Sequence, residues 1–177
     1  MKYYAGIGSR ETPTGTRGFI HEFVDEFNRQ GYTLRSGGAD GADTFFEEKA
    51  SLKDIYLPWK GFNGRPQTRE RSLGASYIQG PTKAAIDLAA RTIHGFERRS
   101  QGAQKLLARN MHQVLGEDLS TPVEMVICWT PEGKIVGGTA HAIRLAKKHE
   151  IPIFNLAKEK DILSLRDRLY QRRIFDL

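Results

Sequence analysis

The chain has 177 residues, of which 39% are hydrophobic, and this is enough for one domain of ordinary size with a buried core. Its single cysteine, Cys128, excludes an internal disulfide framework and a cysteine-cluster zinc site, and no apolar run approaches the length of a membrane span. The net charge is +6, and the basic excess is local, with ten lysines and arginines against three acidic residues between residues 60 and 109.

Strands and helices are predicted to alternate in the first third of the chain. Residues 2–6 read as a short buried strand, and apolar residues then recur at helical spacing between 19 and 27, until Gly31 ends that helix. The chain then continues with a strand at residues 32–36, a helix at 42–50 and a strand at 54–58. Strands joined by helices are parallel with right-handed crossovers, and their sheet is covered on both faces.

The remaining elements are predicted from the same patterns. Residues 59–80 are punctuated by glycine and proline and are predicted to be an ordered functional loop. The elements that follow are helices at 82–93 and 102–115, a strand at 123–129, a helix at 139–149, a strand at 152–156 and a helix at 161–172. We therefore predict one Rossmann-like, three-layer α/β domain over residues 1–177. Its mostly parallel sheet is covered by helices on both faces, with a long loop and helical insertion at about 59–116.

Three glycine-rich turns, at residues 6–10, 36–43 and 137–141, each follow an apolar run and open a helical pattern. A helix start offers free backbone N–H groups and a positive dipole end, and glycine lets an anion approach them closely, so the turns predict a phosphate site. The sequence does not fit the common dinucleotide, nucleoside-triphosphate, serine-hydrolase or zinc-protease sites. The first turn lacks the third glycine of the dinucleotide fingerprint, Ile135 replaces the magnesium-binding residue of a P-loop, and serine-hydrolase and zinc-protease motifs are absent.

The combination of three motifs resembles that of the SMF/DprA–LOG superfamily of Rossmann-like nucleotide-binding proteins. The motifs are Ile-Gly-Ser-Arg at residues 7–10, Ser-Gly-Gly-Ala-Asp-Gly-Ala-Asp at 36–43 and Gly-Gly-Thr at 137–139. The second segment is especially similar to the S-G-G-A-x-G-x-D turn of DprA. The resemblance extends from Tyr4 to Leu156. Residues 56–63 and 126–130 look like those of small stand-alone members often encoded by bacteriophages.

The resemblance implies two different activities. DprA-like proteins bind single-stranded DNA and load a recombinase, although they usually carry extra domains. Lonely-guy proteins cleave the N-glycosidic bond of nucleoside monophosphates with a glutamate of the motif P-G-G-x-G-T-x-x-E, and Ala142 stands in the place of that glutamate here. The leading interpretation is therefore binding of a nucleotide or nucleotide-derived molecule by a sensor or sponge. A phosphoribohydrolase and a single-stranded DNA-binding protein are the alternatives, and whether the chain is an enzyme stays open.

Cleavage of an N-glycoside passes through an oxocarbenium-like state, which a carboxylate would stabilise. Asp43 and Glu47 are the candidate catalytic residues, and the alternative roles of Asp43 are to cap the second helix or to bind a hydroxyl group of the ligand. Arg10 offers a bidentate donor to a phosphate, and the aromatic Trp59 lies just past a strand's carboxyl end, where a base could stack. The predicted ligand-binding residues are Gly8, Ser9, Arg10, Ser36, Gly37, Gly38, Asp40, Gly41, Trp59, Asn63, Arg109, Asn110, Thr130, Gly137, Gly138, Thr139 and His141.

No cofactor and no metal site are predicted. The expected partners are a small-molecule nucleotide and, as the competing class, single-stranded nucleic acid bound by the basic segment 60–109, with Arg65, Arg69 and Arg71 as its test residues. A membrane is not an expected partner. The resemblance implies a homodimer or higher homo-oligomer, for which the two helices between 82 and 115 offer a surface. The expected location is the cytoplasm, or that of the host cell if a phage encodes the protein.

Overall fold

A computed structural model describes residues 1–69 and 71–175 of the chain, so the last two residues of the predicted domain lie outside it. The strands are β1 (Lys2–Gly8), β2 (Tyr32–Ser36), β3 (Lys53–Leu57), β4 (Ala75–Gln79), β5 (Met125–Trp129) and β6 (Ile153–Asn155). The α-helices are α1 (Arg17–Arg29), α2 (Ala42–Lys49), α3 (Lys83–Thr92), α4 (Gln101–Leu115), α5 (Thr139–Lys148) and α6 (Glu159–Phe175). Strands and helices thus alternate for most of the chain, as predicted.

Within the described residues, six strands form one parallel sheet in the order β4-β3-β2-β1-β5-β6. Tyr4 pairs with Leu34 of β2 on one side of β1 and with Met125 of β5 on the other. The chain leaves β1 toward β2 and later returns to the other side of β1 through α3 and α4. The strand order therefore reverses between β1 and β5, and this is the position at which open α/β sheets bind ligands.

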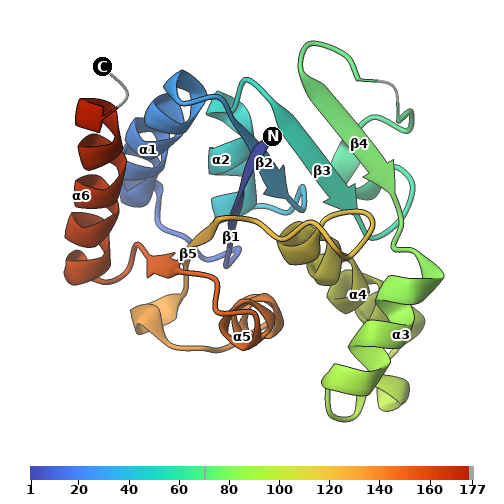
Figure 1. Ribbon diagram of the computed structural model, residues 1–177. Helices are drawn as coiled ribbons and strands as arrows, with labels where there is room; N and C mark the ends of the chain where they lie inside the picture. Colours follow the sequence, from blue (N-terminus) through green and yellow to red (C-terminus); the bar gives the residue numbers. More distant parts are fainter. Residues whose placement is uncertain (70, 176–177) are drawn as a thin grey trace.

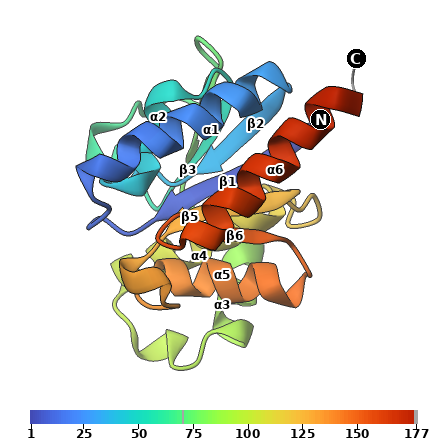
Figure 2. The ribbon, with the colours of Figure 1, turned by 90° about the vertical axis from the view of Figure 1, so that its left-hand side faces the viewer.

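Side chains alternate between the two faces of the sheet and build two separate cores. Helices α1, α2 and α6 cover one face, where Tyr4, Leu34 and Ile127 are buried, and α3, α4 and α5 cover the other, where Ala5 and Val126 are buried. Figure 1 and Figure 2 show these two groups of helices on opposite sides of the strands. The predicted three-layer α/β fold with a parallel sheet is confirmed.

Local sequence signals account for several element boundaries. The Thr82 side chain accepts a hydrogen bond from Ala85 N (3.2 Å) at the start of α3, and that of Ser100 accepts one from Ala103 N (3.3 Å) at the start of α4. Such caps contribute about 1 kcal/mol each to helix stability. On α1, Phe27 stacks on Tyr4 of β1 with ring centroids 3.9 Å apart, which fixes this helix against the centre of the sheet.

The prediction of a loop throughout residues 59–80 is wrong at its end, where β4 extends the sheet. Its residues pair in parallel with β3, Ile55 with Tyr77 and Leu57 with Gln79. Strand β4 is five residues long and lies at the sheet edge. Only Tyr77 and Ile78 among its residues favour a strand, and Ala, Ser and Gln make up the rest, so the sequence carries little of the continuous apolar pattern of a central strand.

The two helices that were expected to offer a dimer surface pack within the chain. Ala85 and Ala89 of α3 and Leu107, Met111 and Val114 of α4 are buried in the same core cluster. The oligomeric state stays a prediction. Among the described helices, none combines the length and the apolar composition needed to cross a bilayer.

Candidate functional site

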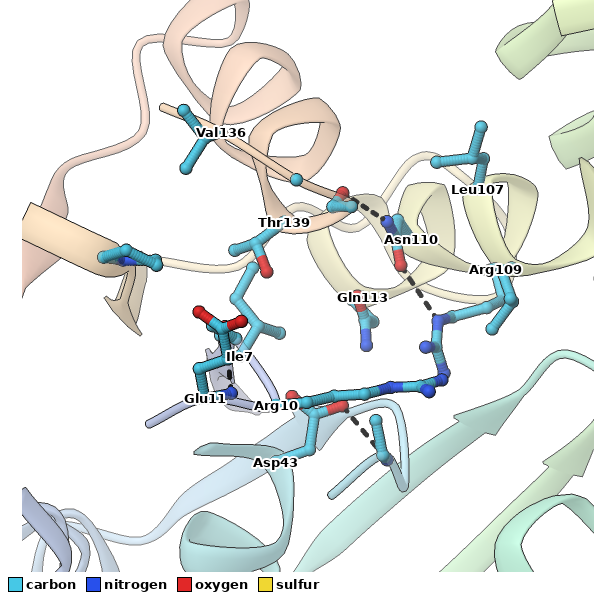
Figure 3. Close-up of a pocket in the computed structure, with 17 residues that line it drawn as sticks. Ile7, Arg10, Glu11, Asp43, Leu107, Arg109, Asn110, Gln113, Val136 and Thr139 are labelled. Carbon is cyan, nitrogen blue, oxygen red and sulfur yellow. Dashed lines mark hydrogen bonds between the residues drawn. The ribbon is translucent and has the colours of Figure 1, made fainter. Parts of the chain in front are cut away.

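A cavity of about 490 Å³ opens at the carboxyl end of the sheet, between the ends of β1 and β5 (Figure 3). We call it the switch-point pocket because it lies where the strand order reverses. Its volume falls within the range of about 300–1,000 Å³ that is usual for small-molecule sites. The predicted residues that line it are Gly8, Ser9, Arg10, Asp43, Arg109, Asn110, Gly137, Gly138 and Thr139.

The first glycine turn forms one wall and is fixed by the backbone on both sides. Ser9 N donates to Trp129 O of β5 (3.0 Å), and Ala42 N of α2 donates to Ser9 O (3.3 Å). Arg10 follows with an exposed side chain that makes no ion pair with the described residues. In Figure 3 this side chain extends across the cavity above Asp43, toward Arg109. An unpaired guanidinium in this position is suited to an anionic ligand.

The glycines of the second turn lie close to other parts of the protein, and at Gly41 the neighbouring atoms are backbone atoms. Gly41 has φ +80°, and a Cβ atom there would lie 2.4 Å from Ser9 O. A Cβ atom on Gly37 would lie 2.3 Å from Nε2 of Gln113 on α4. Real Cβ atoms do not approach so closely, so the second turn brings α2, α4 and the first turn together and supports the pocket from behind.

The third turn differs from the second because its glycines have open space around them. Gly138 has φ −63° and ψ −35°, ordinary helical values, and a Cβ atom there would meet nothing within 4 Å. Among the described residues, no side chain caps the start of α5, and the first turn of α5 contains no acidic residue. Asn110 Nδ2 holds the turn by donating to Gly138 O (3.1 Å). The positive end of the α5 dipole therefore lies at the pocket with its first N–H groups uncapped by any side chain.

Arg109 and Asp43 are both buried at the pocket, and the charge of each influences the other. Arg109 Nη1 donates to the backbone oxygens of Gly37 and Tyr56, the latter at 3.0 Å, and its Nε donates to Asn110 Oδ1 (2.9 Å). Arg109 thus ties α4 to the ends of β2 and β3.

Asp43 is 3% exposed and accepts a hydrogen bond from Ala39 N (3.4 Å). Burial raises the pKa of Asp43 to about 6, although the charge of Arg109 acts in the opposite direction. A carboxyl group with a pKa near neutrality in a pocket is a candidate proton donor or acceptor.

The other predicted site residues do not line the pocket; these are Ser36, Gly37, Gly38, Asp40, Gly41, Glu47, Trp59, Asn63, Thr130 and His141. Most of them hold neighbouring loops in place. Asn63 Nδ2 donates to Gly38 O and to Asp40 Oδ1, both at 3.0 Å. Thr130 Oγ1 accepts from Asn155 Nδ2 (2.6 Å) and is buried.

Three of these outlying residues have distinct surroundings. The Glu47 carboxylate accepts hydrogen bonds from Arg65 Nε (3.0 Å) and Nη2 (2.9 Å), so an ion pair occupies it outside the pocket. Trp59 is 39% exposed and packs edge-to-face on Phe62, with ring centroids 5.2 Å apart. His141 lines a second cavity, between α3 and α5.

The three test residues of the basic segment 60–109 each form an ion pair with a carboxylate. Arg65 pairs with Glu47, Arg69 with Glu117, and Arg71 Nη2 with Asp54 Oδ1 at 2.7 Å. These three arginines fasten the connection between β3 and β4, and their role in nucleic-acid binding stays a prediction.

Several pocket residues lie outside the sequence prediction, and most of them are apolar; these are Ile7, Glu11, Ala39, Leu106, Leu107, Gln113, Pro131 and Val136. One signal was available for α4. Residues 106, 110 and 113 are spaced by four and three positions, which puts them on one face of a helix beside the apolar face of Leu107 and Val114.

Comparison with solved structures finds the same fold in two bacterial proteins. DNA processing protein A from Helicobacter pylori, described for its single-stranded DNA binding mode, matches with a TM-score of 0.54 and 19% identity over 87% of this chain and 64% of its own. DNA processing protein A (DprA) from Streptococcus pneumoniae matches with a TM-score of 0.52 and 14% identity over 94% of this chain and 56% of its own. The fold is DprA-like. This chain spans less than two thirds of the length of either protein, and no protein-family model and no curated protein matches it.

Proposed function

We propose that this protein belongs with the SMF/DprA–LOG superfamily and binds single-stranded DNA, with one nucleotide of the strand inserted into the switch-point pocket. One observation carries the proposal. Arg10, which forms no ion pair with the described residues, and the start of α5, which no described side chain caps, line the same cavity of about 490 Å³. The DprA-like fold supports the choice of ligand, because the Helicobacter pylori protein of that fold is described as binding single-stranded DNA.

The lining of the pocket divides into a polar and an apolar part. Arg10 and the N–H groups at Gly138 and Thr139 offer donors for a phosphate group. Leu106 and Val136 belong to the apolar part, which is suited to the flat face of a base or to a sugar. A single nucleotide carries both kinds of surface.

The proposal is tested by fluorescence anisotropy with a labelled oligothymidylate of about 15 nucleotides. We expect binding of the oligothymidylate to weaken steeply as the salt concentration rises. Thymidine 5′-monophosphate should compete with it, because the mononucleotide and the strand occupy the same pocket. Arg10→Gln removes a charge-assisted phosphate contact and is expected to weaken binding on the order of tenfold. Arg17→Gln is the matched control, since Arg17 pairs with Glu48 at the start of α1. Absence of binding at low salt would refute the proposal.

A second candidate function is favoured by Asp43 alone. It is a buried carboxyl group at the pocket with a pKa of about 6, while Ala142, at the position of the lonely-guy glutamate, is buried in the core. On this candidate the protein binds a free nucleotide, and Asp43 acts in cleavage of its N-glycosidic bond.

Mass spectrometry of small molecules released from the denatured protein tests the second candidate. An intact nucleotide indicates a sensor or sponge, and incubation of the protein with nucleoside monophosphates would release free base if it is a hydrolase. Asp43→Asn would then lose turnover but keep binding. Undiminished base release by Asp43→Asn would rule out the role of Asp43.

A further inference from the structure

A second cavity, of about 330 Å³, lies between α3 and α5, and we call it the α3–α5 groove. Both helices pack against α4, and the buried Met111 of α4 lines the groove. Arg91 at the end of α3 and Arg144 and Lys148 on α5 also line it. Figure 2 shows α3, α4 and α5 together on one face of the sheet.

The groove is lined by cations that have no anionic partner in the part of the chain that the structure describes. Arg91, Arg144 and Lys148 are exposed, none of them forms an ion pair with the described residues, and no acidic residue lines the groove. This differs from Arg65 and Arg71, whose charges are neutralised by carboxylates. Like charges at positions 144 and 148 of one helix repel each other, so a bound anion would stabilise the arrangement.

His141 adds a neutral polar group to the groove. Burial, and then the charges of Arg144 and Arg99, lower the pKa of His141, so its ring is uncharged at neutral pH. An uncharged imidazole can donate one hydrogen bond to a phosphate oxygen without adding to the repulsion among the cations.

The groove adjoins the switch-point pocket along two helices. On α5, Thr139 lines the pocket and His141 the groove; on α4, Leu107 lines the pocket and Met111, one turn later, the groove. Along the axis of α5, position 144 lies about 8 Å and Lys148 about 14 Å beyond Thr139. A chain of phosphates leaving the pocket could therefore meet the cations in succession.

We propose that the α3–α5 groove binds the phosphodiester backbone of the DNA strand as it leaves the switch-point pocket. This rests on the proposed function, in which the pocket holds one nucleotide. Arginine presents a planar pair of donors to a phosphate and lysine a compact charge, and neither reads the base, so the groove contributes affinity without sequence preference.

The test combines Arg91→Gln, Arg144→Gln and Lys148→Gln in one variant and measures two ligands. For the oligothymidylate of about 15 nucleotides, we expect the slope of log K against log salt to fall in magnitude by about 2 and the affinity to drop on the order of a hundredfold near 0.1 M salt. For thymidine 5′-monophosphate, which fills the pocket alone, we expect unchanged affinity. Circular dichroism confirms that the variant is folded.

The matched control replaces Lys2, Lys147 and Lys160 with glutamine, which removes the same charge from exposed positions outside the groove. If the groove variant loses no more affinity or salt slope than this control, the inference is wrong. If the wild-type protein does not bind the strand, the proposed function is wrong as well. If Arg10→Gln weakens binding of the strand and the groove variant does not, only the inference is wrong.

Discussion

Gly138→Ala separates stability from binding because the two effects have opposite signs. The backbone at Gly138 has helical dihedral angles, and a Cβ atom there meets no protein atom within 4 Å. Alanine at such a position stabilises the folded state by about 0.4–1 kcal/mol, since it restricts the unfolded chain. For a chain of this size the expected rise in Tm is roughly 1–4 °C.

The same methyl group would occupy the space through which a phosphate approaches the start of α5. Loss of a hydrogen bond to a charged group costs about 1.5–3 kcal/mol, so the affinity for the oligothymidylate should fall on the order of 10- to 100-fold. Anisotropy and thermal unfolding measure the two effects on one preparation. Gly18→Ala on α1, where the added Cβ also meets nothing within 4 Å, should gain stability and keep full affinity. If Gly138→Ala binds as tightly as the wild type, the phosphate does not lie at α5.

Three further predictions concern the support of the pocket. Because folded Asp43 keeps its proton up to a pH of about 6 and the unfolded chain only to about 4, stability should decline as the pH rises through that interval, and urea titrations of Asp43→Asn should lack this decline. Gly41→Ala should lose at least about 2 kcal/mol in the same titrations, because its φ of +80° and the contact with Ser9 O both oppose a side chain; wild-type stability would show that the turn can move. Burial raises the pKa of Cys128 to about 12, so a thiol reagent at pH 8 should label it only after unfolding.

The sequence predicted the fold where local patterns were strong. The apolar residues Ile20, Phe23, Val24 and Phe27 repeat at helical spacing and lie on the buried side of α1. Strand β4 escaped prediction because Ala75–Gln79 has few residues that favour a strand and is placed at the sheet edge by its pairing with β3, a contact that local patterns do not encode.

At the candidate site, too, local sequence patterns do not reveal contacts between distant parts of the chain. A glycine motif in one dimension does not reveal whether the missing side chain makes room for a ligand or for another part of the chain. At Gly37 and Gly41 the space is filled by Gln113 and by Ser9 O, whereas at Gly138 it is open. Gln113 itself is on α4, more than 70 positions away from the second turn, and only the packing of α4 onto the sheet brings the two together.

The most direct test of the account is an NMR titration of ¹⁵N-labelled protein with the unlabelled oligothymidylate. The account predicts that the amide signals of Ser9, Arg10, Gly138 and Thr139 shift first and furthest, because these groups line the switch-point pocket where the nucleotide is proposed to bind. Unchanged signals at these four residues while others shift, or no shift at all at saturating DNA, would contradict it.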